Sequence, residues 1–143
     1  MFKLFFFIAC VLFSFNLFAQ DKVEWTVVYN TENQSVTFKA EIEEGWHLYS
    51  QKINEGIGPV PTTFTFEPNK KKYKLVGKTI EPTPKTEYDP NFEGELSYFA
   101  GTVEFVQQLK IKSSGEITGK ITFMLCNEEM CIPPVDVAFN FKS

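Results

Sequence analysis

The stretch ITGKITFMLCNEEMCIPPVDVAFNF, residues 117–141, decides the fold class of this chain. On both sides of its centre, apolar side chains alternate with polar or small ones. The apolar positions are Ile117, Ile121, Phe123 and Leu125 before the centre, and Val135, Val137, Phe139 and Phe141 after it. A period of two is the pattern of a half-buried strand, because successive side chains point to opposite faces of a sheet. The stretch therefore predicts two strands, with the chain turning back over residues 127–130.

The same alternation recurs in much of the remaining chain. It covers residues 23–29, 36–42 and 103–111, and Gly, Pro, Asn and Ser residues typical of turns separate the runs. Short strands rich in Phe, Val, Ile and Thr predict an all-β fold, an immunoglobulin-like antiparallel β-sandwich of roughly eight strands. The segment 82–94 is the longest without strand character, and we expect a functional loop there.

The N-terminus has the features of an export signal. Lys3 precedes an apolar run over residues 4–18, and Ala19 is a small residue at the expected cleavage point. The run is shorter than a membrane-spanning helix needs, so we predict a cleaved secretory signal over residues 1–19 and one exported domain over residues 20–143. A retained membrane anchor is the alternative. Cys10 lies inside the apolar run and would leave with the signal.

The composition argues against nucleic-acid partners. The 143 residues carry a formal charge of −4, and all of the basic residues are Lys. Nucleic-acid sites depend on basic patches and on the planar guanidinium of Arg, so we expect no nucleic-acid partner. The basic run 70–72 is interpreted as a solvated loop. Protein partners remain, and no metal or organic cofactor is predicted as part of the main function.

Cys126 and Cys131 carry the chemistry. Two cysteines that flank a tight reversal can approach to the Cα–Cα separation of about 5.5 Å that a disulfide needs. The strand phase places Cys126 on the face opposite the core-facing residues. Pro133 and Pro134 lack N–H donors, so they cannot join a sheet ladder, and a neighbouring strand should not cover that rim. We therefore expect both sulfur atoms to be accessible.

The spacing leaves two interpretations of the pair open, a redox-active disulfide and a structural staple. Closing a loop of about six residues removes only roughly 2 kcal/mol of unfolded-state entropy in the chain-entropy model. A staple that joins distant strands would stabilise a sandwich more. Exposed disulfides also tend to be labile. These arguments favour exchange without excluding the staple.

Three groups of residues together resemble a known family. They are Cys126-x4-Cys131-Ile132-Pro133-Pro134, GWHLYSQ at residues 45–51 and GPVPT at residues 58–62. In this order they resemble the N-terminal periplasmic domain of DsbD, the thiol:disulfide interchange protein. The resemblance covers nearly the whole chain after the signal. It implies a periplasmic, immunoglobulin-like protein-disulfide reductase that takes electrons from a thioredoxin-like domain and passes them to periplasmic oxidoreductases, including the cytochrome c maturation pathway.

The resemblance also implies roles for individual residues. Cys131 would exchange with the partner and Cys126 would be the resolving thiol. The family carries a cap loop whose aromatic side chain covers the disulfide, and the matching segment 88–94 would make Phe92 the cap and Asp89 its acidic neighbour. An ordinary core position is the alternative for Phe92. Tyr49 and His47 match aromatic positions near the site, although Tyr49 also suits simple strand packing.

The main departure from the family is the absence of the membrane-embedded and thioredoxin-like regions. We expect a separate membrane electron donor and thioredoxin-like partners, with the direction of transfer left open. Two other functions also remain open. Met124, Cys126, Met130 and Cys131, with the sole His47, are soft ligands suited to Cu(I). They point to a Cu(I)-binding protein as the first of these functions. The second is a non-catalytic interaction domain with a structural disulfide.

Overall fold

The computed structural model describes residues 21–143 except 55 and 57. The predicted signal over residues 1–19 lies outside the described residues. The described chain contains ten β-strands. They are β1 (Val23–Asn30), β2 (Ser35–Ile42), β3 (His47–Tyr49), β4 (Thr63–Phe66), β5 (Tyr73–Ile80), β6 (Lys85–Asp89), β7 (Gly94–Phe99), β8 (Thr102–Ile111), β9 (Glu116–Cys126) and β10 (Cys131–Lys142). The predicted all-β class is confirmed.

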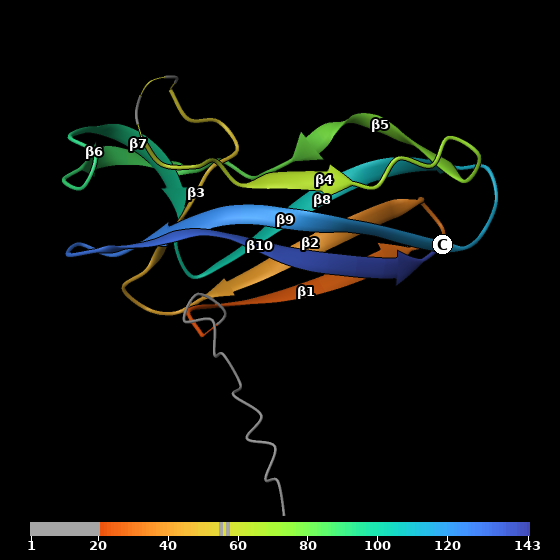
Figure 1. The fold of residues 1–143 in the computed structure, drawn as a ribbon, viewed down its shortest axis with the longest axis horizontal. Coiled ribbons are helices and arrows are strands. Elements are labelled where there is room, and N and C mark those ends of the chain that lie inside the picture. The colour runs from red at the N-terminus through yellow and green to blue at the C-terminus, as the bar shows by residue number, and fades with distance from the viewer. Residues whose placement is uncertain (1–20, 55, 57) are drawn as a thin grey trace, which may run out of the picture.

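The strands form two antiparallel sheets packed face to face (Figure 1). One sheet has the order β1-β2-β8-β5, and the other has the order β10-β9-β3-β7-β6, with β4 pairing β9 beyond the end of β3. The expectation of a strandless loop over residues 82–94 is wrong for β6. That strand is an exposed edge strand, so its sequence carries no apolar alternation, and pairing with β7 alone holds it.

Aromatic side chains fill the space between the sheets. Phe38 on β2 lies with its ring 4.6 Å from that of Phe64 and 4.8 Å from that of Phe139, measured between centroids. Burying a Phe side chain contributes about 1.5–3 kcal/mol. β4 crosses close to β9 at Gly119, where a Cβ atom would overlap the carbonyl oxygen of Thr65 and the Phe139 ring. This close approach holds β4 against β9 within the larger sheet.

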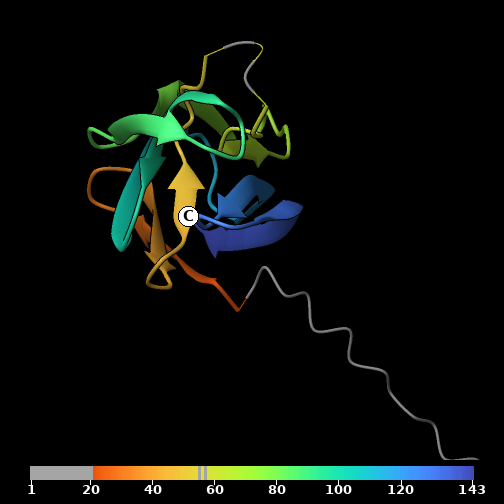
Figure 2. The same cartoon turned by 90° about the vertical axis from the view of Figure 1, so that its left-hand side faces the viewer.

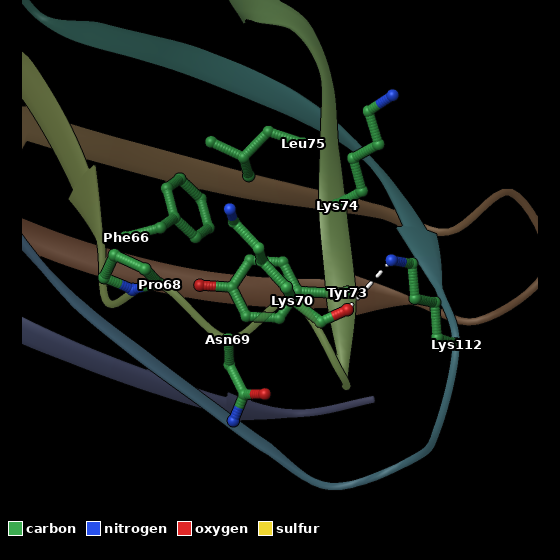
Figure 3. A pocket seen from close by; sticks show the side chains of 8 residues that line it. All are labelled: Phe66, Pro68, Asn69, Lys70, Tyr73, Lys74, Leu75 and Lys112. Carbon is green, nitrogen blue, oxygen red and sulfur yellow. Dashed lines mark hydrogen bonds between the residues drawn. The ribbon is translucent and has the colours of Figure 1, made fainter.

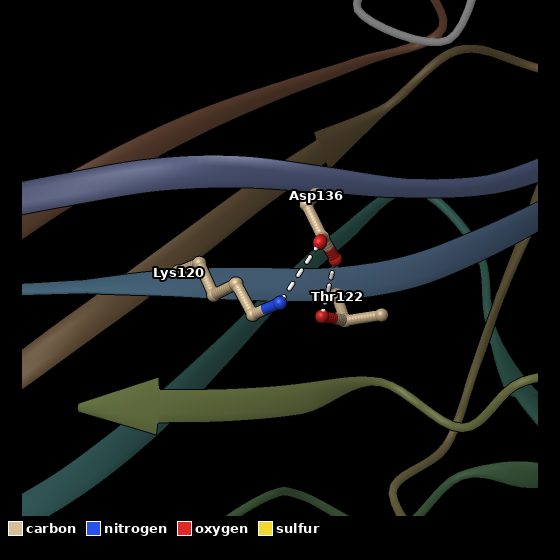
Figure 4. Close-up of polar contacts among 3 residues, drawn as sticks. All are labelled: Lys120, Thr122 and Asp136. Carbon is tan, nitrogen blue, oxygen red and sulfur yellow. Dashed lines mark hydrogen bonds and ion pairs between the residues drawn. The ribbon is translucent and has the colours of Figure 1, made fainter. Parts of the chain in front are cut away.

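The β9–β10 hairpin forms one edge of the larger sheet. Its register shifts between Ile132 and Val135, which leaves Pro133 and Pro134 outside the ladder, and among the described residues no strand pairs with the outer side of β10. This confirms the prediction that the prolines interrupt pairing. On the solvent side of the same hairpin, Asp136 accepts hydrogen bonds from Lys120 and Thr122 (Figure 4). The described residues contain no helix that is long and apolar enough to span a bilayer.

The β6–β7 and β9–β10 turns lie at the same end of the sandwich, and the C-terminus lies at the other (Figure 1). Figure 2 looks onto the end that holds the two turns. The candidate site is built there, on the outer face of the larger sheet.

Candidate functional site

Cys126 and Cys131 close the β9–β10 hairpin with a disulfide. They are direct partners in the strand register, with Cα atoms 4.0 Å apart. The turn between them is held by a hydrogen bond from the Asn127 backbone N–H to the Met130 carbonyl, at 2.8 Å. The Asn127 side chain also accepts from the N–H groups of Glu129 and Met130. Local hydrogen bonds therefore shape this turn independently of the S–S bond.

The two sulfur-bearing residues differ in exposure. Cys126 lies on the face opposite the inter-sheet core, as the strand phase predicts, yet it is only 1% exposed, whereas Cys131 is half-buried. The expectation that both are accessible is wrong for Cys126. The outer face at this end carries a second apolar cluster, which includes Tyr49, Leu96 and Tyr98 and covers Cys126. The side chains that bury Cys126 come from β3 and β7. The local sequence pattern around the cysteines cannot reveal them.

Tyr49 and Asp89 join two of the strands beneath the site. The fully buried Tyr49 hydroxyl donates to Asp89 Oδ2 at 2.5 Å, while Asp89 Oδ1 accepts from the Asn91 backbone N–H at 2.8 Å. Burial raises the pKa of Tyr49 well above its usual range, and the hydrogen bond to the Asp89 carboxylate adds to this. One carboxylate thus shapes the β6–β7 turn and attaches it to β3.

Phe92 lies in that same turn and packs against the cluster that contains Cys126, as Cys131 also does. Its ring meets the Tyr49 ring edge-on, at 6.0 Å between centroids and 87° between planes. The Asn91 side-chain amide donates to the Asn127 carbonyl at 3.0 Å, which ties the β6–β7 turn to the cysteine hairpin. The structure therefore brings Phe92, Asp89 and Tyr49 together at the cluster that contains Cys126.

His47 is the cross-strand partner of Cys126 on β3, so Cys131, Cys126 and His47 form one row across three strands. The imidazole stacks on Tyr98, with ring centroids 4.2 Å apart. The Tyr98 hydroxyl donates to Glu87 Oε2 at 2.7 Å. Burial raises the pKa of Tyr98 to about 12, and this hydrogen bond contributes to the rise as the second cause.

An open cleft beside the hairpin is lined by several of these groups, among them His47, Glu87, Asp89, Tyr98, Asn127 and Glu128. Sequence reasoning missed Glu87 and Tyr98. The alternation of Leu96 and Tyr98 indicates a half-buried strand and could have identified Tyr98 as a neighbour of the site. Glu87 carried no such signal, because it lies on the edge strand that the sequence did not predict.

The proposed soft-metal ligands are less closely gathered. Met124 packs against the same cluster as Cys131, whereas Met130 is 53% exposed in the hairpin turn. Both cysteine sulfurs are engaged in the disulfide in this state. Within the described part of the chain, no three His, Cys, Asp or Glu side chains are arranged to hold a metal ion.

A second hollow lies at the opposite end of the sandwich, near the β4–β5 turn (Figure 3). Phe66, Tyr73 and Leu75 form its apolar floor, and Lys70, Lys74 and Lys112 stand around it. Lys112 Nζ donates to the Lys70 carbonyl at 2.8 Å. The basic run 70–72 forms a turn with Lys70 and Lys71 exposed, as predicted, and it lies far from the disulfide.

Known proteins are similar to this chain in sequence pattern and fold. The family model described as "Thiol:disulfide interchange protein DsbD, N-terminal" matches residues 15–143. The DsbD N-terminal domain of Neisseria meningitidis in the reduced form has a similar structure, with a TM-score of 0.67 and 16% identity over 87% of each chain. No curated protein sequence gives a significant match.

Two further solved structures share the fold. The complex between the DsbD N-terminal and PilB N-terminal domains of Neisseria meningitidis gives a TM-score of 0.59 and 18% identity, over 83% of this chain and 80% of that chain. The N-terminal periplasmic domain of ScsB from Proteus mirabilis gives a TM-score of 0.55 and 21% identity, over 82% of this chain and 44% of that chain.

Proposed function

The chain belongs to the DsbD N-terminal domain family of thiol:disulfide interchange proteins, and on that premise we propose that Cys126 and Cys131 relay electrons between partner proteins. The observation that carries the proposal is the unequal exposure of the pair. Cys131 is half-buried at the sheet edge, while Cys126 is 1% exposed beneath the outer cluster. This difference supports Cys131 as the cysteine that meets a partner and Cys126 as the resolving one.

The exchange proceeds through a mixed disulfide. In the reduced protein the Cys131 thiolate attacks one sulfur of a partner disulfide, forms an S–S bond to it and releases the other partner sulfur as a thiolate. The Cys126 thiolate then attacks Cys131 Sγ, which re-forms the internal disulfide and releases the second partner thiolate. Two electrons pass to the partner, and its two thiolates take up the two protons that Cys126 and Cys131 lose. The reverse sequence reloads the protein from a dithiol donor.

The surrounding residues restrict this chemistry to docked partners. Phe92 acts as a cap on the disulfide, held by its contact with Tyr49 and by the Asp89 carboxylate that fixes the turn. His47 extends the row of the cysteines and stacks on the neighbouring ring, so it keeps one side of the site filled. A partner displaces Phe92 and gains access to Cys131.

The protein is exported to the periplasm, and its partners there are thioredoxin-like proteins. A membrane-bound donor supplies the electrons. The apolar run over residues 4–18 supports export. A DsbD N-terminal domain of Neisseria meningitidis forms a complex with a PilB N-terminal domain, which supports a protein partner here. Cytochrome c maturation is one pathway that such electrons would serve.

The reduction potential of the pair tests the proposal directly. Thiol trapping of the purified protein across a series of glutathione or dithiothreitol ratios gives the fraction reduced at each potential. We expect a potential above about −300 mV, in the range of exchanging disulfides. A value far below that figure would identify a structural staple and contradict the proposal.

Single cysteine variants test the unequal roles. Cys126→Ser retains the partner-facing thiol and lacks the resolving one, so we expect it to accumulate mixed disulfides with periplasmic thioredoxin-like proteins. Cys131→Ser, the matched control, leaves only the buried thiol and should accumulate few. Equal trapping by both variants contradicts the assignment while leaving exchange itself intact.

A further inference from the structure

Gly58, in the connection between β3 and β4, touches the ring of Phe92 from a distant part of the chain. A Cβ atom at position 58 would lie 2.6 Å from Phe92 Cδ1 and 2.8 Å from Cε1. Non-bonded carbon atoms are in favourable contact at about 3.5–4.0 Å, so both distances are deep in the repulsive range. The Phe92 ring occupies the space that any other side chain would need.

The backbone itself does not require glycine at this position. Gly45 and Gly56 adopt left-handed φ values of 85° and 87°, whereas the φ of Gly58 lies outside that region. The conformational freedom that explains many turn glycines is therefore unused here. What remains is the close approach to Phe92.

Neighbouring contacts limit how far either partner can retreat. Beside Gly58, Pro59 is buried, and the Thr62 hydroxyl donates to the Tyr49 carbonyl at 2.6 Å. On the other side, Asp89 and Asn91 fix the backbone of the turn that carries Phe92. The softest element between them is the Phe92 side chain, which can rotate away. An added methyl group at position 58 would therefore displace the ring.

We infer that Gly58 is a positioning residue for the cap: its lack of a side chain allows Phe92 to rest on Tyr49 and the cysteine cluster, and so sets how strongly the disulfide resists small thiols. This inference rests on the proposed role of Phe92. It adds a second loop to the control of the site, remote in sequence from both the cysteines and the cap turn.

The test is the rate at which dithiothreitol reduces the Cys126–Cys131 disulfide in the absence of any partner. Gly58→Ala should be reduced on the order of tenfold faster than the wild-type protein, the change expected when crowding by one methyl group unseats the ring. Asn54→Ala, an exposed side chain in the same connection, is the control and should leave the rate unchanged.

The double variants separate positioning from a general loosening of the fold. In a Phe92→Ala background, Gly58→Ala should have no further effect, because the ring it would displace is absent. In a Phe92→Leu background, the smaller side chain should fit beside the methyl group, so the Gly58→Ala effect should largely disappear. An equal acceleration by Gly58→Ala with and without the Phe92 ring overturns the inference.

The remaining outcomes also decide between the proposals. Wild-type rates in both Gly58→Ala and Phe92→Ala overturn the cap itself. A wild-type rate in Gly58→Ala together with fast reduction of Phe92→Ala overturns only the role of Gly58. Should Gly58→Ala fail to fold, the double variant with Phe92→Leu must fold if the ring is the obstacle, and its failure overturns the inference.

Discussion

Reducing the disulfide should destabilise the protein only slightly, and the size of the effect follows from the hairpin. The cysteines are five positions apart, so the S–S bond closes a loop of six residues. In the chain-entropy model such a loop contributes about 2 kcal/mol, against roughly 4.7 kcal/mol for a loop of 100 residues. The turn inside it keeps the hydrogen bonds that the Glu129 and Met130 N–H groups donate to the Asn127 side chain when the S–S bond opens. The fold should therefore survive reduction.

The assay is thermal unfolding of the oxidised and reduced forms under otherwise identical conditions. For a domain of about 120 residues, a loss of 2 kcal/mol corresponds to a fall in Tm of roughly 8 °C. The double variant Cys126→Ala, Cys131→Ala, measured without reductant, controls for effects of the reductant. A loss above about 4 kcal/mol, or a reduced form without a cooperative transition, would show that the bond is a staple and refute this reasoning.

Three further predictions concern the residues around the site and in the core. Asp89→Ala should destabilise the protein by about 1–3 kcal/mol in urea unfolding, because it leaves the buried Tyr49 hydroxyl without an acceptor; Asp136→Ala, which removes only exposed partners, should cost less, and equal losses contradict the assigned role. The pKa of Tyr98 rises on folding from about 10 to about 12, so its contribution is complete below pH 10 and is lost between pH 10 and 12. The free energy of unfolding of Tyr98→Phe should therefore fall less than that of the wild type between pH 10 and 12. Identical pH profiles of the two proteins would contradict the raised pKa of Tyr98. Gly119→Ala should lower the free energy of unfolding by about 1–3 kcal/mol through overpacking, measured as a fall in the urea midpoint, and an unchanged midpoint rules out the close approach.

The sequence predicted the cysteine hairpin well because its information is local. Alternation along β9 fixes which side chains face the core, so Phe123 and Leu125 point inward and Cys126 points outward. The prolines lie outside the ladder for the equally local reason that they lack an N–H group. Features of this kind need no knowledge of the rest of the chain.

The burial of Cys126 could not be predicted in this way. Its cover comes from Tyr49 and Tyr98, which reach it only because β3 lies between β9 and β7. β6 was missed for a different reason. Its residues are mostly exposed, so no apolar period marks it, and its strand conformation depends on pairing with β7. The contact between Gly58 and Phe92 is likewise a product of tertiary packing.

The double pairing of β9 has a consequence for how sequences of this kind can vary in length. β3 and β4 both pair with β9, one near Cys126 and the other near Gly119. A single-residue insertion within β9 would reverse the facing of every side chain beyond it and move the sulfur of Cys126 into the space between the sheets. Two pairing strands oppose such a shift along most of the strand. Length changes should therefore be tolerated in the turns and rejected within β9.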